Sequence, residues 1–542
     1  MLDRLPDRAL ELIVQYLRSV DNNQLDPLCF AQVNRRLRQK AIKRVWEYFT
    51  LSKAIQPTGA TRDFLAVLPH LSRLQIADDR ELSSEQWITG LDRLSKPPCS
   101  WTHISMVSVE LDGFIGEQRT LAVVERVMRF AVEMLANIKE LWVSLPQDSG
   151  IAGKLLGHKY ANVEEIRLVG RSAIQEIAPV LIPNYSRLTA ISLDRQSAAA
   201  TSCSELVVRS QQTLRELNIE EYTVELGSSL RLLPGSEWAA YPQLRQLAIS
   251  QVAGVYDRWM VDGARLDAVE MLYFRDTEYP ATGAGNRVLE STHVRLMGAA
   301  WARLRLLVVD SLSRGDVERL GSYAPRLEVL RVGLLGGDVH LEAGGQPAAA
   351  LDLAAVAVIL QTCRQLEDFS VETPEPYEDV YNARCPHSET VACWERPYDL
   401  GQRFGPLVVD PPHTRLRALM LNAWALTFDQ LRSLFGALPA LNSFEGNLKF
   451  TSDSYSSNFI NDGRMGGSRL AHVSLVLSAP PTRHPRAFKS SLLRFVGGLP
   501  ALRMLEIYGS ADMPGIEDAV ARVAPGCVAG FYSLTENGCC QG

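Results

Sequence analysis

The chain has 542 residues, of which 46% are hydrophobic and 22% are charged, and its formal net charge is -6. These fractions are typical of an ordinary globular protein, and the negative balance argues against general nucleic-acid binding. No apolar run approaches the roughly 18 residues of a membrane span, and acids near the start leave no apolar core for a secretory signal. Nine scattered cysteines suit free thiols. We therefore expect a cytoplasmic or nuclear protein.

The first 51 residues predict three short helices, which cover residues 6–18, 27–34 and 35–49. In the stretch LPDRALELIVQYL, apolar residues recur at the spacing of one helix face. Pro6 suits a first helical position, where its missing N–H has no intrahelical partner. Three short helices cannot bury all of the apolar side chains of this segment, so we expect a surface that another chain covers.

This segment resembles an F-box. The family pattern is Leu-Pro, an apolar helix, a polar turn, and a second apolar helix followed by a Trp. It is matched here by Leu5, Pro6, Leu10, Ile13, Leu17, Leu28, Val33, Leu37 and Trp46. The turn at residues 18–27 is longer than is common in the family. The resemblance implies that the matching residues bind a Skp-type adaptor, which connects to a cullin–RING ubiquitin ligase, and that the following domain recruits the target.

The rest of the chain is dominated by a six-residue pattern, LxxLxL, which occurs fifteen times. Six of the fourteen start-to-start gaps lie between 22 and 26 residues, the range of leucine-rich repeats. One repeat cannot bury its own leucines, whereas stacked repeats can. The copies begin at Leu71, Trp101, Ile138, Val163, Leu188, Leu214, Leu244, Leu266, Leu304, Leu327, Leu366, Leu416, Leu441, Leu470 and Leu502.

Each copy alternates like a short strand, and helical sequence lies between copies, for example at residues 315–325 and 427–439. Strand and helix in repeated succession predict a parallel sheet with helices on one side. The fold class is therefore α/β. We expect a leucine-rich-repeat solenoid over residues 52–542, with parallel strands on the concave face and helices outside, preceded by the F-box at 1–51. Loop insertions are expected near 333–350, 373–412 and 451–467.

Positions three, five and seven of each copy should line the exposed concave face. Read in this way, the fifteen copies place eleven acids there, Glu270 among them, against three bases. Clustered carboxylates favour a basic target, although they would also serve for solubility alone. The candidate target-binding residues are Glu140, Trp142, Glu165, Glu216 and Glu220. We expect Trp142 to offer its ring to an arginine of the target.

Motifs of a catalytic or cofactor site are missing from the sequence. CPHSETVAC, at residues 385–393, offers three candidate zinc ligands where a structural site needs four. There is no Walker motif, no H-E-x-x-H and no G-x-S-x-G. We therefore expect no enzyme activity, no metal and no cofactor.

The sequence thus predicts a non-catalytic substrate-recognition subunit of a Skp–cullin–F-box ubiquitin ligase. Its expected partners are the adaptor and a protein target, with no membrane and no nucleic acid. The alternative is a leucine-rich-repeat scaffold or inhibitor that is independent of ubiquitin ligases. In that case the N-terminal helices would only cap the solenoid, since solenoids need such caps.

Overall fold

The computed structural model describes residues 48–55, 71–79, 81–97, 99, 101–110, 114, 121–135, 137–145, 162–170, 187–193, 206–219, 241–250, 268–275, 301–312, 314–335, 353–371, 409, 411–449, 469–477, 485–508 and 515–532. Residues 1–47, which carry every predicted adaptor-binding residue, lie outside this part. So do most of the three predicted insertions. The chain divides into two compact units, Met1–Leu244 (unit 1) and Arg245–Gly542 (unit 2).

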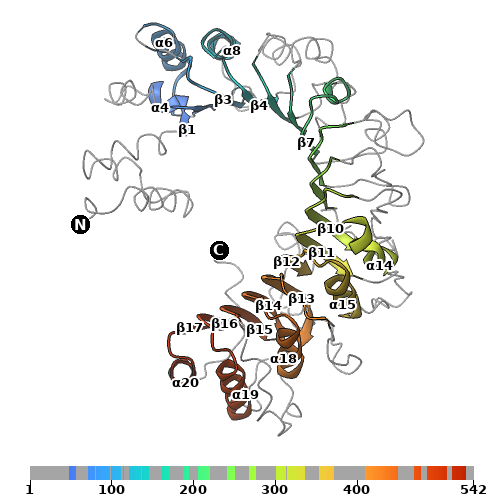
Figure 1. Ribbon diagram of the computed structural model, residues 1–542. Helices are drawn as coiled ribbons and strands as arrows, with labels where there is room; N and C mark the ends of the chain where they lie inside the picture. The colour runs from blue at the N-terminus through green and yellow to red at the C-terminus, as the bar shows by residue number, and fades with distance from the viewer. Residues whose placement is uncertain are drawn as a thin grey trace, which may run out of the picture. The chain divides into compact units, whose positions relative to one another are not determined.

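The described part of unit 1 contains seven strands, each parallel to the next in sequence. Three bounded helices lie on one side of this sheet (Figure 1), and residues 206–209 form a further helical turn before β7. The strands are β1 (Tyr48–Thr50), β2 (Arg73–Ile76), β3 (Met106–Glu110), β4 (Glu140–Leu145), β5 (Glu165–Gly170), β6 (Ala190–Leu193) and β7 (Glu216–Ile219). The helices are α4 (Leu51–Ile55), α6 (Ser84–Leu94) and α8 (Leu121–Met134).

Unit 2 repeats this arrangement, with ten parallel strands and five helices among its described residues. Its helices again lie on one side of the sheet (Figure 1). The strands are β8 (Gln246–Ser250), β9 (Met271–Arg275), β10 (Leu306–Leu312), β11 (Val329–Leu335), β12 (Asp368–Val371), β13 (Ala418–Leu426), β14 (Ser443–Leu448), β15 (His472–Leu477), β16 (Met504–Tyr508) and β17 (Val528–Tyr532). The helices are α14 (Arg314–Tyr323), α15 (Leu353–Thr362), α18 (Phe428–Ala437), α19 (Pro485–Gly497) and α20 (Ile516–Val523).

The core lies between sheet and helices and is built from the pattern leucines. In β13, Leu419 and Leu421 are buried, as is Leu416 just before the strand. Helix α18 covers this region as predicted. Its first turn is closed by a capping box, in which the Thr427 hydroxyl and the Gln430 side chain each accept the other residue's backbone N–H. The alternation of apolar and polar residues therefore builds the α/β leucine-rich-repeat solenoid expected from the sequence.

All fifteen copies form strands, but two of them are framed differently from the prediction. Met271, expected in the core, is 40% exposed, whereas Leu272 is fully buried and Met271 pairs with Leu306 of β10. The copy therefore begins at Val269. The copy at Trp101 likewise begins at Ile104, because Met106 pairs with Arg73 of β2. In both segments the predicted frame and the observed frame each place apolar residues at the pattern positions. Pairing with the neighbouring strand decides which frame is adopted.

The sheet also extends further than the fifteen copies. The predicted third helix reached residue 49, but Tyr48 and Phe49 belong to β1, which pairs with β2. That helix end was wrong, and the sheet begins within the segment expected to be F-box. At the other end, β17 adds a strand beyond β16. Residues 333–335, placed in an insertion, complete β11.

Candidate protein-interaction surface

The described helices leave one face of each sheet uncovered, which we call the open face (Figure 1). In unit 1 the strand register brings Glu140 and Glu165 side by side, and Ala190 separates Glu165 from Glu216. Trp142 lies in the next row, two residues along β4. Four of the five predicted target-binding residues therefore lie on one open face, while Glu220 lies outside the described residues.

The acidic row changes the chemistry of its central member. Burial raises the pKa of Glu165 above the ordinary value of a glutamate, and the adjacent Glu140 carboxylate raises it further. Glu216 adds to this shift, and Arg73 opposes it. Glu165 is thus a carboxylate that its surroundings do not fully compensate, as expected if a cationic group covers the row in a complex.

Trp142 has a cation of the same chain beside its ring, a contact that the prediction of a target arginine did not include. The guanidinium of Arg167, which pairs with Trp142 across β4 and β5, lies 5.1 Å from the centre of its ring. The chain itself therefore supplies the cation. Residues at the same position in successive copies lie side by side in the sheet. The contact of Trp142 with Arg167 could therefore have been predicted from the sequence.

The first row of the open face differs in unit 2. It continues through Met271, Leu306 and Val329, which are apolar, before reaching Asp368. Asp368 is partly compensated by Arg331, 3.6 Å away. Glu270 is not on this face, because the corrected frame places it just before β9. Glu445 in β14 and Glu506 in β16 also lie on the open face of unit 2, so among the described residues the predicted acidic positions occur on both units.

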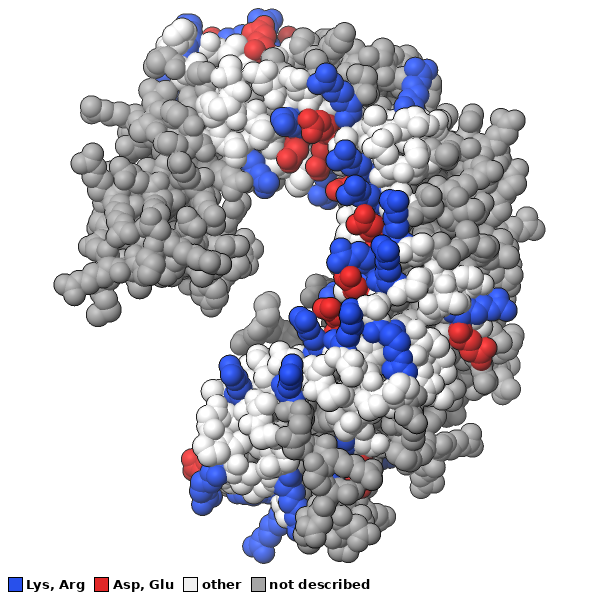
Figure 2. All heavy atoms as spheres, in the orientation of Figure 1, with Lys and Arg blue, Asp and Glu red and all other residues white. Residues whose placement is uncertain are grey.

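A second charged surface runs along the edge where the strands of unit 2 begin. It is formed by the residues immediately before and after the first apolar residue of each copy, positions that the sequence prediction did not examine. We call it the arginine rim. Figure 2 shows Lys and Arg side chains gathered along these strands. The rim residues are Arg245, Arg303, Arg305, Arg326, Arg415, Arg417, Arg469 and Arg503, with Glu270, Glu328 and Glu367 between them.

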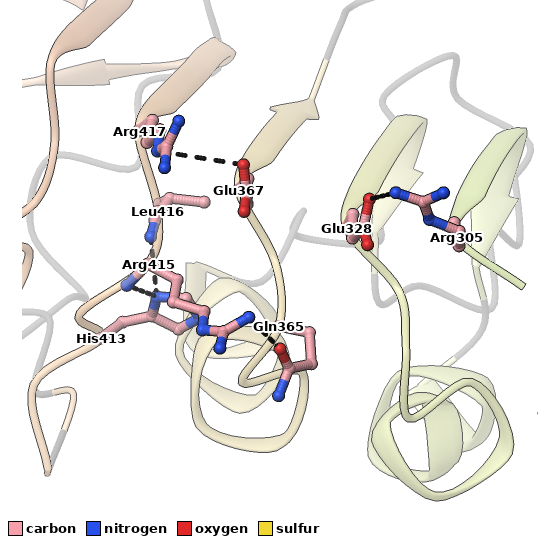
Figure 3. A network of polar contacts seen from close by, with 8 residues as sticks. All are labelled: Arg305, Glu328, Gln365, Glu367, His413, Arg415, Leu416 and Arg417. Carbon is pink, nitrogen blue, oxygen red and sulfur yellow. Dashed lines mark hydrogen bonds and ion pairs between the residues drawn. The ribbon is translucent and has the colours of Figure 1, made fainter.

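Ion pairs cross the rim from strand to strand. Arg305 lies 2.7 Å from Glu328, and Arg417 lies 3.9 Å from Glu367 (Figure 3). Arg415 donates to the side chain of Gln365 in the same view. These contacts join neighbouring repeats and hold part of the rim in a defined arrangement.

Chemistry of a catalytic or metal site is not seen in the described part of the chain. No group of three or more His, Cys, Asp or Glu residues there could hold a metal ion. Burial raises the pKa of the Cys363 thiol to about 11, so it stays protonated and unreactive at neutral pH. No helix among the described residues is both long and apolar enough to span a membrane.

A scan of protein-family models and a search of curated proteins returned no match. Solved structures similar to this chain include the yeast Rad7–Elc1 complex, at 14% identity and a TM-score of 0.36, covering 83% of this chain and 91% of that one. A TLR13–ssRNA13 complex matches at 13% identity and a TM-score of 0.37. The match covers 86% of this chain and 58% of that one, so this chain spans little more than half of its length. A Leptospira interrogans leucine-rich-repeat protein, LIC12759, matches at 11% identity and a TM-score of 0.30, and the match covers 91% of this chain and 97% of that one. The fold assignment rests on the strands and repeats, not on these low scores.

Proposed function

We propose that this chain is a non-catalytic substrate-recognition subunit of a Skp–cullin–F-box ubiquitin ligase, acting in the cytoplasm or nucleus. One observation carries the proposal: a segment with the residue pattern of an F-box is followed directly by an open leucine-rich-repeat sheet. Trp46, the last residue of the pattern, is separated from β1 by one residue. The segment proposed to bind the adaptor is thus followed at once by the sheet proposed to bind the target.

In this proposal the F-box-like segment and the repeats bind different proteins. Leu5, Pro6, Leu10, Ile13, Leu17, Leu28, Val33, Leu37 and Trp46 bind the adaptor. The open face of unit 1, with Glu140, Glu165 and Glu216, binds a basic segment of the target. The chain contributes proximity, because it raises the local concentration of target lysines beside the charged ubiquitin carrier.

The experiment is a pull-down of a purified Skp-type adaptor with the full-length chain. Replacing Leu5 and Pro6 by Ala together should abolish binding, while far-UV circular dichroism of the repeats stays unchanged. The matched control replaces Asn22 and Asn23 by Ala, in the stretch that lies outside the F-box pattern, and should bind like the wild type. Wild-type binding by the Leu5 and Pro6 variant would overturn the proposal.

A second candidate function is a leucine-rich-repeat scaffold independent of ubiquitin ligases. The pairing of β1 with β2 favours it, because Tyr48–Thr50, at the end of the segment expected to be F-box, belong to the sheet. If the segment serves only as a cap, the double variant should lower the unfolding temperature of unit 1, and the wild-type chain should not bind the adaptor.

A further inference from the structure

The arginine rim carries a charge opposite to that of the chain as a whole. Eight arginines and three glutamates occupy its positions, although the chain has a formal net charge of -6. A random distribution of an acidic composition would not concentrate positive charge on one edge. Such a concentration creates a local positive potential that attracts anions.

Two hollows interrupt the rim, and three arginines line each of them. The first hollow, of about 770 Å³, is lined by Arg303, Arg305 and Arg326. The second, of about 620 Å³, is lined by Arg415, Arg417 and Arg469. Glu270 and Glu328 share the first hollow, and Glu367 shares the second. Each hollow therefore holds more positive than negative groups.

The glutamates compensate only some of these arginines. Arg305 and Arg417 have their partners in Glu328 and Glu367. Within the described residues, the guanidinium groups of Arg303, Arg326 and Arg469 make no hydrogen bond or ion pair. A guanidinium presents its N–H donors in a planar fork that fits a carboxylate with two parallel hydrogen bonds. These three groups are free to bind one.

The backbone holds both hollows in a fixed relation within unit 2. Regular ladder bonds run through the rim, such as the Glu328 N–H to the Arg305 carbonyl at 2.8 Å. The first hollow lies at β10 and β11, and the second between β13 and β15. At about 4.8 Å per strand their centres are roughly 17 Å apart, the length of about five residues of extended chain.

We infer that the arginine rim of unit 2 is a docking surface for an acidic, Asp- and Glu-rich segment of a partner protein. The segment lies extended along the rim and places one group of carboxylates in each hollow. The glutamates between the arginines suit discrete, spaced carboxylates better than the uniform charge of a nucleic-acid backbone. This surface is separate from the open face of unit 1, and the inference does not depend on a ubiquitin-ligase role.

The probe is a labelled synthetic peptide that carries two Glu-Glu pairs five residues apart, measured by fluorescence anisotropy with the full-length chain. A variant with Arg303→Gln, Arg326→Gln and Arg469→Gln should lose about tenfold or more in affinity and much of its salt dependence. The matched control changes Arg319, Arg486 and Arg522, on α14, α19 and α20, to Gln. It should bind within about twofold of the wild type.

Any of the following results would overturn the inference. The first is equal loss in the rim variant and the control, since only net charge would then matter. The second is unchanged binding by the rim variant, or no binding of the peptide by the wild-type chain. The third is tighter binding of a single-stranded oligonucleotide with the same dependence on the rim arginines, which would assign the surface to nucleic acid. Circular dichroism of each variant verifies folding, which surface Arg→Gln changes should leave intact.

Discussion

The Nδ1 atom of His413 accepts the backbone N–H of Leu416, 3.1 Å away, and so fixes the tautomer of a buried ring. Because Nδ1 accepts, the ring proton sits on Nε2 and is donated to the carbonyl of Cys363 at 3.1 Å. The turn from His413 to Leu416 carries Arg415 of the arginine rim (Figure 3). A neutral imidazole therefore shapes part of the charged surface.

Stability of unit 2 should depend on the charge of His413. Burial lowers the pKa of His413, the hydrogen bond to Cys363 opposes this, and the positive charges of Arg364 and Arg415 lower it further. Below the ordinary histidine pKa of about 6.5, the unfolded chain takes up a proton that the folded ring resists, so stability falls with falling pH. Urea unfolding at pH 7.5 and 5.5 should show this loss, and His413→Leu should lack that part of it. Equal pH dependence in both proteins would contradict the prediction.

Two helical glycines of unit 2 should respond in opposite directions to Ala. A Cβ on Gly321 of α14 would lie 2.5 Å from the backbone oxygen of Thr362, at the end of α15, so the helices would have to separate. A Cβ on Gly436 of α18 meets nothing within 4 Å. We expect Gly321→Ala to destabilise unit 2 by about 1–3 kcal/mol and Gly436→Ala to stabilise it by roughly 0.5–1 kcal/mol. Denaturant midpoints measure both, and a neutral Gly321→Ala would show that the helices can separate easily.

Removing the charge of Glu165 should stabilise unit 1 slightly. The raised pKa of this carboxyl, caused first by burial and then by Glu140, means that the folded state resists its ionisation. Glu165→Gln keeps the shape and removes the repulsion, so the unfolding temperature at neutral pH should rise by up to about 2 °C. Glu164→Gln is the control, because Glu164 lies 3.9 Å from Lys139 and is exposed. A lower unfolding temperature for Glu165→Gln would show that the carboxylate is stabilising.

The acidic row of unit 1 should bind a basic peptide in a salt-dependent manner. A variant with Glu140, Glu165 and Glu216 all changed to Gln should bind a Lys- and Arg-rich probe more weakly, by about tenfold, and respond less to salt. Several positions must change together because single exposed charges contribute little. The rim variant serves as control and should bind this probe like the wild type. If all three proteins bind equally, the row serves solubility only.

Much of the fold could be predicted from the sequence because the burial of alternate residues produces both the repeated sequence pattern and the packing of the core. Leu416, Leu419 and Leu421 are apolar because they face the helices, and the same alternation reveals the strand. The frame of β9 could not be fixed in this way, since Leu266 and Val269 both open an acceptable copy. Strands β1 and β17 were missed because "YFT" and "VAGFY" lack the opening leucines of the pattern.

The candidate surfaces could be predicted only in part. Glu140, Glu165 and Glu216 occupy the same position in their copies, so the sequence predicts that they lie in one row. The structure places them in one row. The contact of Trp142 with Arg167 could have been predicted in the same way, because both residues are fifth in their copies. The arginine rim was missed because only positions three, five and seven of each copy were compared, although Arg415 and Arg417 flank Leu416 in the sequence.

The pairing of each described strand of unit 2 with its sequence neighbours also affects how such a protein can evolve. Gain or loss of one whole repeat leaves every remaining pairing intact, because no strand depends on a distant one. Loss of the repeat that carries Glu367 would bring Glu328 beside Arg417 and leave the rim with one acid fewer. Recombination between repeats can thus alter the spacing and balance of surface charges in single steps, while the hydrophobic core is inherited unchanged.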